Sequence, residues 1–235
     1  MLKIRLFLFK LKNFIIIHKS KFLKKKIKSK YKIIKKQFEN YIETKNFSQK
    51  WFLNNFEIFH YYLPKDNAAN FSYLEIGSYE GLSLLNILFN YKNSKVTAID
   101  LWGESNINSE SLKVNFNEVE EKFNKNLEGY NFIKIKKDSV IALRELLKEK
   151  RSFDFIYIDG SHNGEDILSD AIESYKLLNT EGLIIFDDVV NVNKNINIQS
   201  YIGFEKFCEI YKNQIKVLYL KNIAVIKKLS LKTNI

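Results

Sequence analysis

The chain has 235 residues, 46% of them hydrophobic, and a formal net charge of +11. This length accommodates one α/β domain plus an extension, and the hydrophobic content excludes a disordered chain. The single cysteine, Cys208, excludes an intramolecular disulfide and argues against a cysteine-based zinc site, so a cytoplasmic, reducing location is compatible with the sequence.

The first fifty residues are expected to form a basic helical extension that precedes a domain in residues 51–235. Between residues 19 and 36 about every second residue is lysine, and the remainder of the chain is nearly balanced in charge. Lysines interrupt the apolar runs, so no stretch reaches the roughly 18 uncharged residues of a membrane span. No small-residue cleavage site indicates a secretory signal. Because arginine is scarce and the aromatic residues show no stacking pattern, we expect no nucleic-acid partner.

Apolar residues near the N-terminus fall on one helical stripe. They are Ile4, Phe7, Leu8, Leu11, Phe14 and Ile15, and the neighbouring basic residues lie largely opposite. Such a helix, followed by a lysine cluster, suits peripheral contact of residues 1–40 with an anionic membrane surface at the inner face of the membrane. The alternative is a helical extension that packs on the domain or mediates homo-oligomer formation.

Residues 51–62 are expected to form one aromatic-rich helix, which Pro64, the only proline, ends. The aromatic residues of this helix are expected to pack against the domain, with a substrate-facing position as the alternative. They are Trp51, Phe52, Phe56, Phe59, Tyr61 and Tyr62. His60 is expected to be structural.

Strands and helices alternate over the rest of the chain. The pattern predicts strands at residues 73–76, 95–99, 132–135, 153–158, 182–186, 215–220 and 223–227, and helices at 82–91, 109–127, 140–150, 166–178 and 202–211. This alternation predicts a doubly wound, mostly parallel seven-stranded sheet of the Rossmann-like α/β class. The tight connection at residues 221–222 makes the last two strands a hairpin, so the final strand is expected to run antiparallel.

A turn with two glycines follows the first strand, in the segment LEIGSYEGLS. Gly77 and Gly81 would let backbone N–H groups approach a ligand closely, and the helix N-terminus that follows adds free donors. Glu75, at the end of the strand, can accept a hydrogen bond from an amine or a hydroxyl. Because similar turns also occur as plain strand–helix connections, their meaning depends on the surrounding residues.

Acidic residues follow five consecutive strands at their carboxyl ends. They are Glu75, Asp100, Asp138, Asp159 and the pair Asp187 and Asp188. Doubly wound sheets bind their ligands beyond these ends. One such residue alone often serves as a helix cap, but the whole set predicts a binding site along one edge of the sheet.

These segments resemble, in order, the motifs of the class I S-adenosylmethionine-dependent methyltransferases. The segments are LEIGSYEGLS, AIDLW, KKDS, FDFIYIDGSH and GLIIFDD, within a similarity that covers residues 71–228. YIDGSH followed by an acidic pair is typical of the subfamily that includes the macrocin-type, metal-dependent sugar O-methyltransferases. The ExGxxxG turn lacks the G-x-G-x-x-G spacing of dinucleotide-binding proteins, which argues against a NAD-binding oxidoreductase.

The resemblance implies a site for S-adenosylmethionine at the carboxyl edge, which Asp159 also borders. The methionine part would lie against Glu75, Gly77, Ser78 and Gly81, the ribose against Asp100, and the adenine by Asp138 and Ser139. Trp102 would cover the cofactor, with a position in the core as the alternative.

The carboxylates of Asp159, Asp187 and Asp188 form the predicted catalytic and metal-binding group. Three carboxylates beyond adjacent strands would repel one another unless a cation lies between them, and a hard divalent ion such as Mg²⁺ prefers oxygen ligands. The resemblance implies that Asp159 is a ligand and the base that takes the proton of the acceptor. Members of that subfamily often have D-G-D-H where residues 159–162 of this chain read D-G-S-H, so Ser161 replaces a carboxylate. His162 is expected to contact substrate or cofactor, with a role at the start of the next helix as the alternative.

The predicted function is therefore metal-assisted methyl transfer from S-adenosylmethionine to a hydroxyl of a small molecule or glycan, such as a sugar or glycolipid. The alternatives are a metal-independent methyltransferase acting on another atom, and a non-catalytic relative that binds cofactor without turnover. The polar segments 103–111 and 191–200 are the expected determinants of acceptor specificity.

Overall fold

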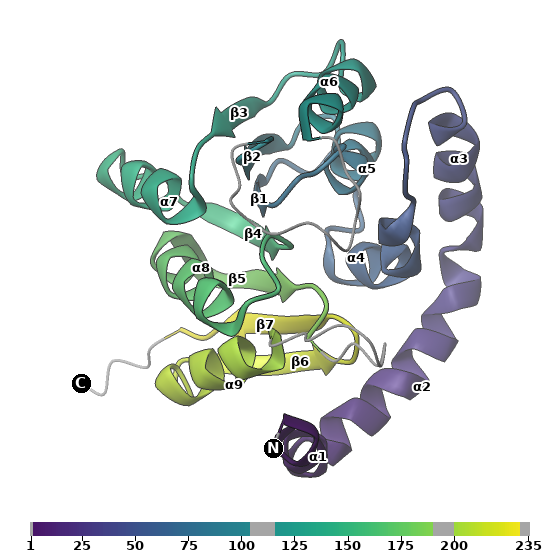
Figure 1. Cartoon of the computed structure of the whole chain (residues 1–235). Helices are drawn as coiled ribbons and strands as arrows, with labels where there is room; N and C mark the ends of the chain where they lie inside the picture. The colour runs from purple at the N-terminus through teal and green to yellow at the C-terminus, as the bar shows by residue number, and fades with distance from the viewer. Residues whose placement is uncertain (1, 104–115, 190–199, 231–235) are drawn as a thin grey trace.

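The computed structural model describes residues 2–103, 116–189 and 200–230, in which helices cover both faces of one sheet (Figure 1). The sheet has seven strands in the order β3-β2-β1-β4-β5-β7-β6. The strands are β1 Ser72–Ile76, β2 Lys95–Asp100, β3 Ile133–Lys136, β4 Phe153–Ile158, β5 Leu178–Phe186, β6 Ile215–Leu220 and β7 Ala224–Lys228. The five neighbouring strands β3, β2, β1, β4 and β5 pair in parallel, and β7 runs antiparallel to both β5 and β6. The predicted doubly wound fold and the antiparallel final strand are confirmed.

Two hydrophobic cores lie on opposite faces of the sheet, because successive side chains of a strand point to opposite faces. The domain helices are α4 Phe56–Tyr62, α5 Leu82–Asn90, α6 Phe116–Asn126, α7 Ser139–Lys148, α8 Gly164–Leu177 and α9 Ser200–Ile210. Helices α4, α5 and α6 pack with Tyr73 and Tyr157 on one face. Helices α7, α8 and α9 pack with Leu74 and Ile156 on the other. Adjacent residues of β1 and β4 thus serve different cores.

Three helices at the N-terminus form an arm along one flank of the domain: α1 Leu2–Lys12, α2 Phe14–Lys30 and α3 Lys32–Ile42 (Figure 1). Helix α2 covers the edge strand β6, where the Ser20 hydroxyl accepts a hydrogen bond from the Leu220 N–H at 2.9 Å. Farther along, Ile27 and Phe38 join the core that contains α4 and α5. The arm is therefore packed into the fold.

The helix predicted over residues 51–62 is two elements, the 3-10 helix η1 at Trp51–Asn54 and α4. Asn55 separates them, and its side chain reaches Asp187. The neighbouring phenylalanines are buried as predicted, whereas Trp51 is 53% exposed. His60 is buried among aromatic rings, and burial lowers its pKa to about 4, so the imidazole is structural and neutral.

Other boundaries differ little from those predicted. Strand β5 begins at residue 178 instead of 182, and the helix predicted over 109–127 is described from Phe116 onward. The two segments predicted to determine acceptor specificity lie largely outside the described residues. In the described part of the chain, we find no helix with the length and apolar character needed to span a bilayer.

Candidate active site

Four strands end in register at one edge of the sheet. β1 pairs with β2 and β4, and β4 with β5, up to the last residues of these strands. The residues at or just beyond these ends, Gly77, Asp100, Asp159 and Asp187, therefore lie along one edge. Backbone hydrogen bonding also continues beyond the strands, since the Asp159 N–H donates to the Ile76 carbonyl at 2.8 Å. The edge that the sequence predicted is thus formed by the parallel pairing.

Gly77 is required both by its conformation and by its surroundings. Its φ is +82°, and an added Cβ would lie 2.3 Å from the Asp159 carbonyl oxygen. Gly81, with φ of +85°, stands at the start of α5, where an added Cβ would meet the Leu127 side chain at 2.9 Å. The glycine turn therefore passes directly against the end of β4, which brings it to the predicted catalytic aspartate.

Glu75 is fully buried beneath this turn. Its carboxylate accepts hydrogen bonds from the Tyr73 hydroxyl at 2.8 Å and the Ser83 hydroxyl at 2.9 Å. Burial raises its pKa to about 7. The buried Ser78 hydroxyl lies near the carboxylate and lowers that pKa, yet no described residue makes a hydrogen bond of good geometry with it. Ser78 thus has a polar group available to a ligand, while the contact of Glu75 with a cofactor stays a prediction.

Asp100 joins the end of β2 to the glycine turn. Its two oxygens accept hydrogen bonds from the N–H groups of Tyr79 at 2.8 Å and Trp102 at 2.9 Å, and burial raises its pKa. The Trp102 indole is 2% exposed and donates to the Tyr79 carbonyl. It packs on Phe123, with the Lys134 ammonium 4.5 Å from its ring centre. This placement favours the alternative of a core tryptophan.

Asp138 and Ser139 lie at the start of α7, beyond β3. Asp138 is exposed and caps the helix, accepting a hydrogen bond from the Ile141 N–H at 3.1 Å. The Ser139 hydroxyl donates to Asp170 at 2.6 Å. Asp170 is 3% exposed, and burial raises its pKa to about 7. No sequence pattern points to Asp170, which lies within a helix, and the predicted adenine contacts stay predictions.

The carboxylates of Asp159 and Asp187 meet around one hydroxyl. The Tyr157 oxygen lies 3.0 Å from Asp159 Oδ2 and 2.5 Å from Asp187 Oδ2. A phenol has one proton, so it cannot satisfy two ionised carboxylates at once, and the pair needs a shared proton or a cation. Burial and the proximity of Asp187 raise the pKa of Asp159, while burial and Asp188 raise that of Asp187.

Asp188 and His162 lie beside this pair. The Asp188 backbone has a φ of +49°, and its carboxylate accepts a hydrogen bond from the Asn222 amide at 3.1 Å. His162 Nε2 lies 3.8 Å from the other Asp188 oxygen. Among residues 2–103, 116–189 and 200–230, no three His, Cys, Asp or Glu side chains converge as a metal site would require. The three-aspartate ligand set, and the role of His162, stay predictions.

Asn55 is a site residue that sequence reasoning missed. Its amide nitrogen lies 3.1 and 3.2 Å from the two Asp187 oxygens, to which it donates. The arm holds it in place, because Lys24 and Lys35 donate to the two backbone carbonyls that precede it, at 2.9 and 2.7 Å. An asparagine before a helix suggests only a cap, so this long-range contact is visible only in the tertiary structure.

The exposed indole of Trp51 borders the glycine turn. Its ring stacks on that of Tyr79, with 6.0 Å between ring centres. The prediction that all six aromatic residues of this segment pack against the domain therefore holds only in part for Trp51, which contacts the domain with one ring and is 53% exposed. The indole remains more than half exposed because its only described ring neighbour lies on one side, which leaves an aromatic surface near the predicted cofactor turn.

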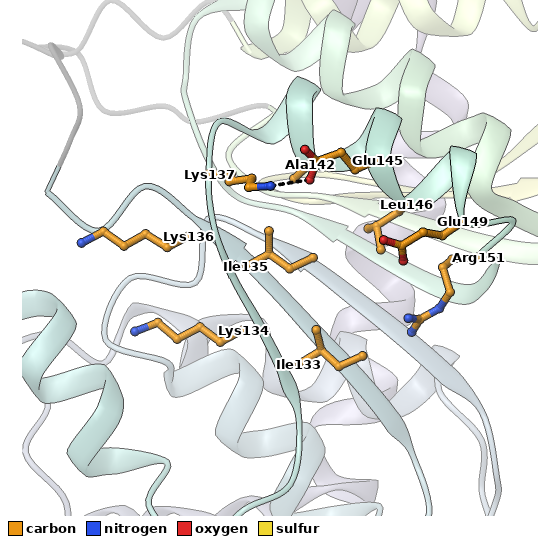
Figure 2. Close-up of a pocket in the computed structure, with 10 residues that line it drawn as sticks. All are labelled: Ile133, Lys134, Ile135, Lys136, Lys137, Ala142, Glu145, Leu146, Glu149 and Arg151. Atoms are coloured by element: carbon orange, nitrogen blue, oxygen red, sulfur yellow. Dashed lines mark hydrogen bonds and ion pairs between the residues drawn. The ribbon is translucent and has the colours of Figure 1, made fainter.

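A hollow of about 350 Å³ lies elsewhere, between the edge strand β3 and α7 (Figure 2). Ile133, Ile135 and Leu146 contribute apolar side chains, and an ion pair between Lys137 and Glu145 lies at its rim. None of the predicted site residues lines it. We therefore place the candidate active site at the carboxyl edge of the sheet, on the basis of its chemistry.

Comparison with known proteins finds a matching family for the part of the chain that contains this edge. The family described as "Methyltransferase domain" matches residues 74–189. A curated relative, the uncharacterized protein R132 of Acanthamoeba polyphaga mimivirus, is 28% identical over 161 residues. That match covers 63% of this chain and 66% of the viral protein, slightly less than two thirds of its length.

Solved structures share the fold at low sequence identity. A Staphylococcus aureus protein assigned as a caffeoyl-CoA O-methyltransferase is 15% identical with a TM-score of 0.54, over 89% of this chain and 100% of that one. The MycE methyltransferase of the mycinamycin pathway, solved with Mg, SAH and mycinamycin VI, is 14% identical with a TM-score of 0.53, over 80% of this chain and 52% of that one. Residues 74–189 therefore match the methyltransferase-domain family, and the chain has the Rossmann-like fold of these methyltransferase structures.

Proposed function

We propose that the protein transfers a methyl group from S-adenosylmethionine to an acceptor hydroxyl, as a metal-dependent enzyme of the macrocin type. The observation that carries this proposal is the carboxylate pair of Asp159 and Asp187 around the Tyr157 hydroxyl. The pair adjoins the glycine turn, because Gly77 packs against the Asp159 backbone. Methyl transfer to a hydroxyl needs a proton acceptor close to the bound cofactor, and this arrangement provides one.

The residues of the turn fit S-adenosylmethionine. A side chain at Gly77 would collide with the Asp159 backbone and displace the turn, and the Ser78 hydroxyl offers a buried polar group. The acidic edge also favours the positive charge of a sulfonium. Asp100 is already oriented by two backbone N–H groups, which keeps its carboxylate in place for the ribose hydroxyls.

Two of the three predicted carboxylates, those of Asp159 and Asp187, lie together and would supply oxygen ligands to a hard divalent cation. The third, Asp188, does not converge with them in this structure and would have to turn toward the ion. When bound, such an ion would lower the pKa of an acceptor hydroxyl. The Asp187 carboxylate is fixed by hydrogen bonds from Asn55, Tyr157 and the Asp188 backbone N–H. Asp159 accepts one described side-chain hydrogen bond, from Tyr157, so its remaining lone pairs are available to take the acceptor's proton. The magnesium in the MycE structure supports this assignment.

A sugar or another hydroxyl-bearing ring is the acceptor class that we propose. The Trp51 indole offers an exposed flat surface, and carboxylates lie at the same edge of the sheet. The mycinamycin bound by MycE is consistent with a hydroxylated acceptor of this kind.

Calorimetry with S-adenosylhomocysteine and a methyl-transfer assay test the proposal. We expect the protein to bind S-adenosylhomocysteine, and we expect EDTA to remove its activity and Mg²⁺ to restore it. The Asp159→Asn variant should still bind S-adenosylhomocysteine but should transfer methyl groups at least about 100-fold more slowly. Asp166→Asn, an exposed aspartate in the first turn of α8, is the control and should retain activity. Activity that persists in EDTA would favour the metal-independent alternative. A properly folded protein that does not bind S-adenosylhomocysteine would contradict both the metal-dependent proposal and its metal-independent alternative.

A further inference from the structure

Helices α1 and α2 expose a continuous apolar stripe, which we name the outer stripe. It consists of Ile4, Phe7, Leu8, Leu11, Phe14, Ile15 and Phe22, and each of these side chains is more than half exposed. Their spacing of three or four residues places them on one helical face. The other large exposed apolar residues in the described chain lie outside α1 and α2; Ile141 and Ile210, for example, are on α7 and α9.

The opposite face of the same helices already packs on the domain. Phe9 contacts the rings of Tyr201 and Phe204 in α9, and Ser20 accepts the hydrogen bond from β6. Ile27 continues this inner face into the core. At about 100° per residue the buried and exposed sets lie on opposite sides of the helix. The fold therefore uses the inner face, and the outer stripe remains without a partner inside the described chain.

The charged side chains of the helices that bear the outer stripe are all positive. Residues 1–36 contain fourteen Lys or Arg and no Asp or Glu. Lys19, Lys21, Lys25 and Lys26 are exposed on α2, next to the aromatic end of the stripe, where His18 lies between the rings of Phe14 and Phe22. Long lysine side chains beside an apolar face can extend toward lipid headgroups while the apolar residues enter the acyl region.

We propose that the outer stripe binds the surface of an anionic lipid bilayer, with α1 and α2 lying in the plane of that surface. Seven apolar side chains require an apolar phase, which a nucleic acid does not offer. A second copy of this chain would bring two clusters of positive charge together, which disfavours self-association through this face. An anionic bilayer satisfies the apolar and the charged residues together.

The same arm connects this surface to the active edge. Lys24 and Lys35 hold the segment that bears Asn55, and Asn55 donates to Asp187. Because the arm is packed on the domain, contact of the outer stripe with lipid would set the orientation of the active edge relative to the bilayer. The lipid contact itself does not depend on the proposed methyl transfer.

Vesicle flotation of the full chain tests the proposal. The probes are phosphatidylcholine vesicles with and without phosphatidylglycerol, at low and raised salt. We expect binding to the anionic vesicles to be about tenfold or more tighter than to the neutral ones, and weaker at raised salt. The triple variant Phe14→Ser, Ile15→Ser, Phe22→Ser should lose about tenfold or more in affinity, because it removes exposed apolar area. Lys19→Gln with Lys21→Gln should reduce the preference for the anionic vesicles.

Two controls separate this surface from general stickiness. Ile141→Ser with Ile210→Ser removes side chains of similar exposure, 56% and 54%, on α7 and α9, and should bind vesicles like the wild type. S-adenosylhomocysteine binding monitors the fold of every variant. Equal vesicle binding by the triple variant and the wild type would overturn the proposal. Two other results would also overturn it, if neither the wild type nor the triple variant binds vesicles. One is a dimer, seen by sedimentation, that the triple variant abolishes; the other is RNA binding that the triple variant abolishes.

Discussion

At the scale of single residues, the candidate site keeps ionisable groups where water cannot solvate them. Glu75 is held beneath the glycine turn by two hydroxyl donors, and Asp159 shares a tyrosine proton with Asp187. Each buried carboxylate opposes folding in its charged form. These residues are therefore placed for ligand binding at a cost in stability, which a substitution can measure.

The pH dependence of stability provides a test at Glu75. Burial raises its pKa from 4.5 to about 7, so between these pH values the folded chain holds a proton that the unfolded chain has released. Stability should therefore fall as the pH rises through this window. Glu75→Gln should remove that contribution and gain about 1–2 kcal/mol at pH values above the window. Urea unfolding at both ends of the window measures it, with the exposed Glu165→Gln as control; identical slopes in wild type and Glu75→Gln would contradict the expectation.

A matched pair of glycines tests the close approach of the turn to β4. Gly77 and Gly129 have nearly the same φ, +82° and +86°, but an added Cβ meets the Asp159 carbonyl at the first and open space at the second. Gly129→Ala should cost about 1–2 kcal/mol for its conformation alone. Gly77→Ala should cost about 1–3 kcal/mol more and abolish S-adenosylhomocysteine binding. Chemical unfolding and calorimetry measure both variants, and similar losses at the two positions would show that the contact is unimportant.

At the scale of elements, the N-terminal arm has two faces with different roles. Phe38 on α3 is fully buried against Phe56 and Phe89, whereas Phe22 on α2 is 65% exposed. The same residue type therefore stabilises the fold at one position and is available to a partner at the other. Composition alone cannot distinguish these positions, because both lie in lysine-rich helices.

Alanine substitutions at these two phenylalanines separate the roles. Phe38→Ala should lower the free energy of unfolding by about 3–5 kcal/mol, since it leaves a cavity in a packed core. Phe22→Ala should change it by no more than about 0.5 kcal/mol. Denaturant unfolding of the two variants gives the comparison. A large loss at Phe22 would mean that the outer stripe packs on protein.

At the scale of the whole molecule, the arm packs on the domain and shares its core. It covers the edge strand β6, and it reaches the active edge through Lys24, Lys35 and Asn55. Without it, the β6 edge and the aromatic side of α4 would be open to solvent, which favours aggregation.

Deletion of N-terminal segments tests whether the domain needs the arm to fold. Removing residues 1–45 should yield a protein that aggregates or does not fold, because Ile27, Tyr31, Phe38 and Ile42 leave the core. Among the side chains that the structure describes in residues 1–13, Phe9 is the one that is buried, so a chain without these residues should fold with a modestly lower Tm and should still bind S-adenosylhomocysteine. Thermal unfolding and calorimetry compare the two. A stable, cofactor-binding chain of residues 46–235 would contradict the expectation.

The sequence by itself determined the α/β class, the antiparallel final strand and the row of acidic residues. Alternation of short apolar runs with helical patterns is local information, and parallel pairing then aligns the strand ends that follow Ile76 and Ile158. Only the tertiary structure decided that Asn55 binds Asp187, that Asp170 binds Ser139 and that Trp102 lies in the core. These contacts join residues far apart in the chain, so they depend on how the helices pack on the sheet, which no local pattern of residues specifies.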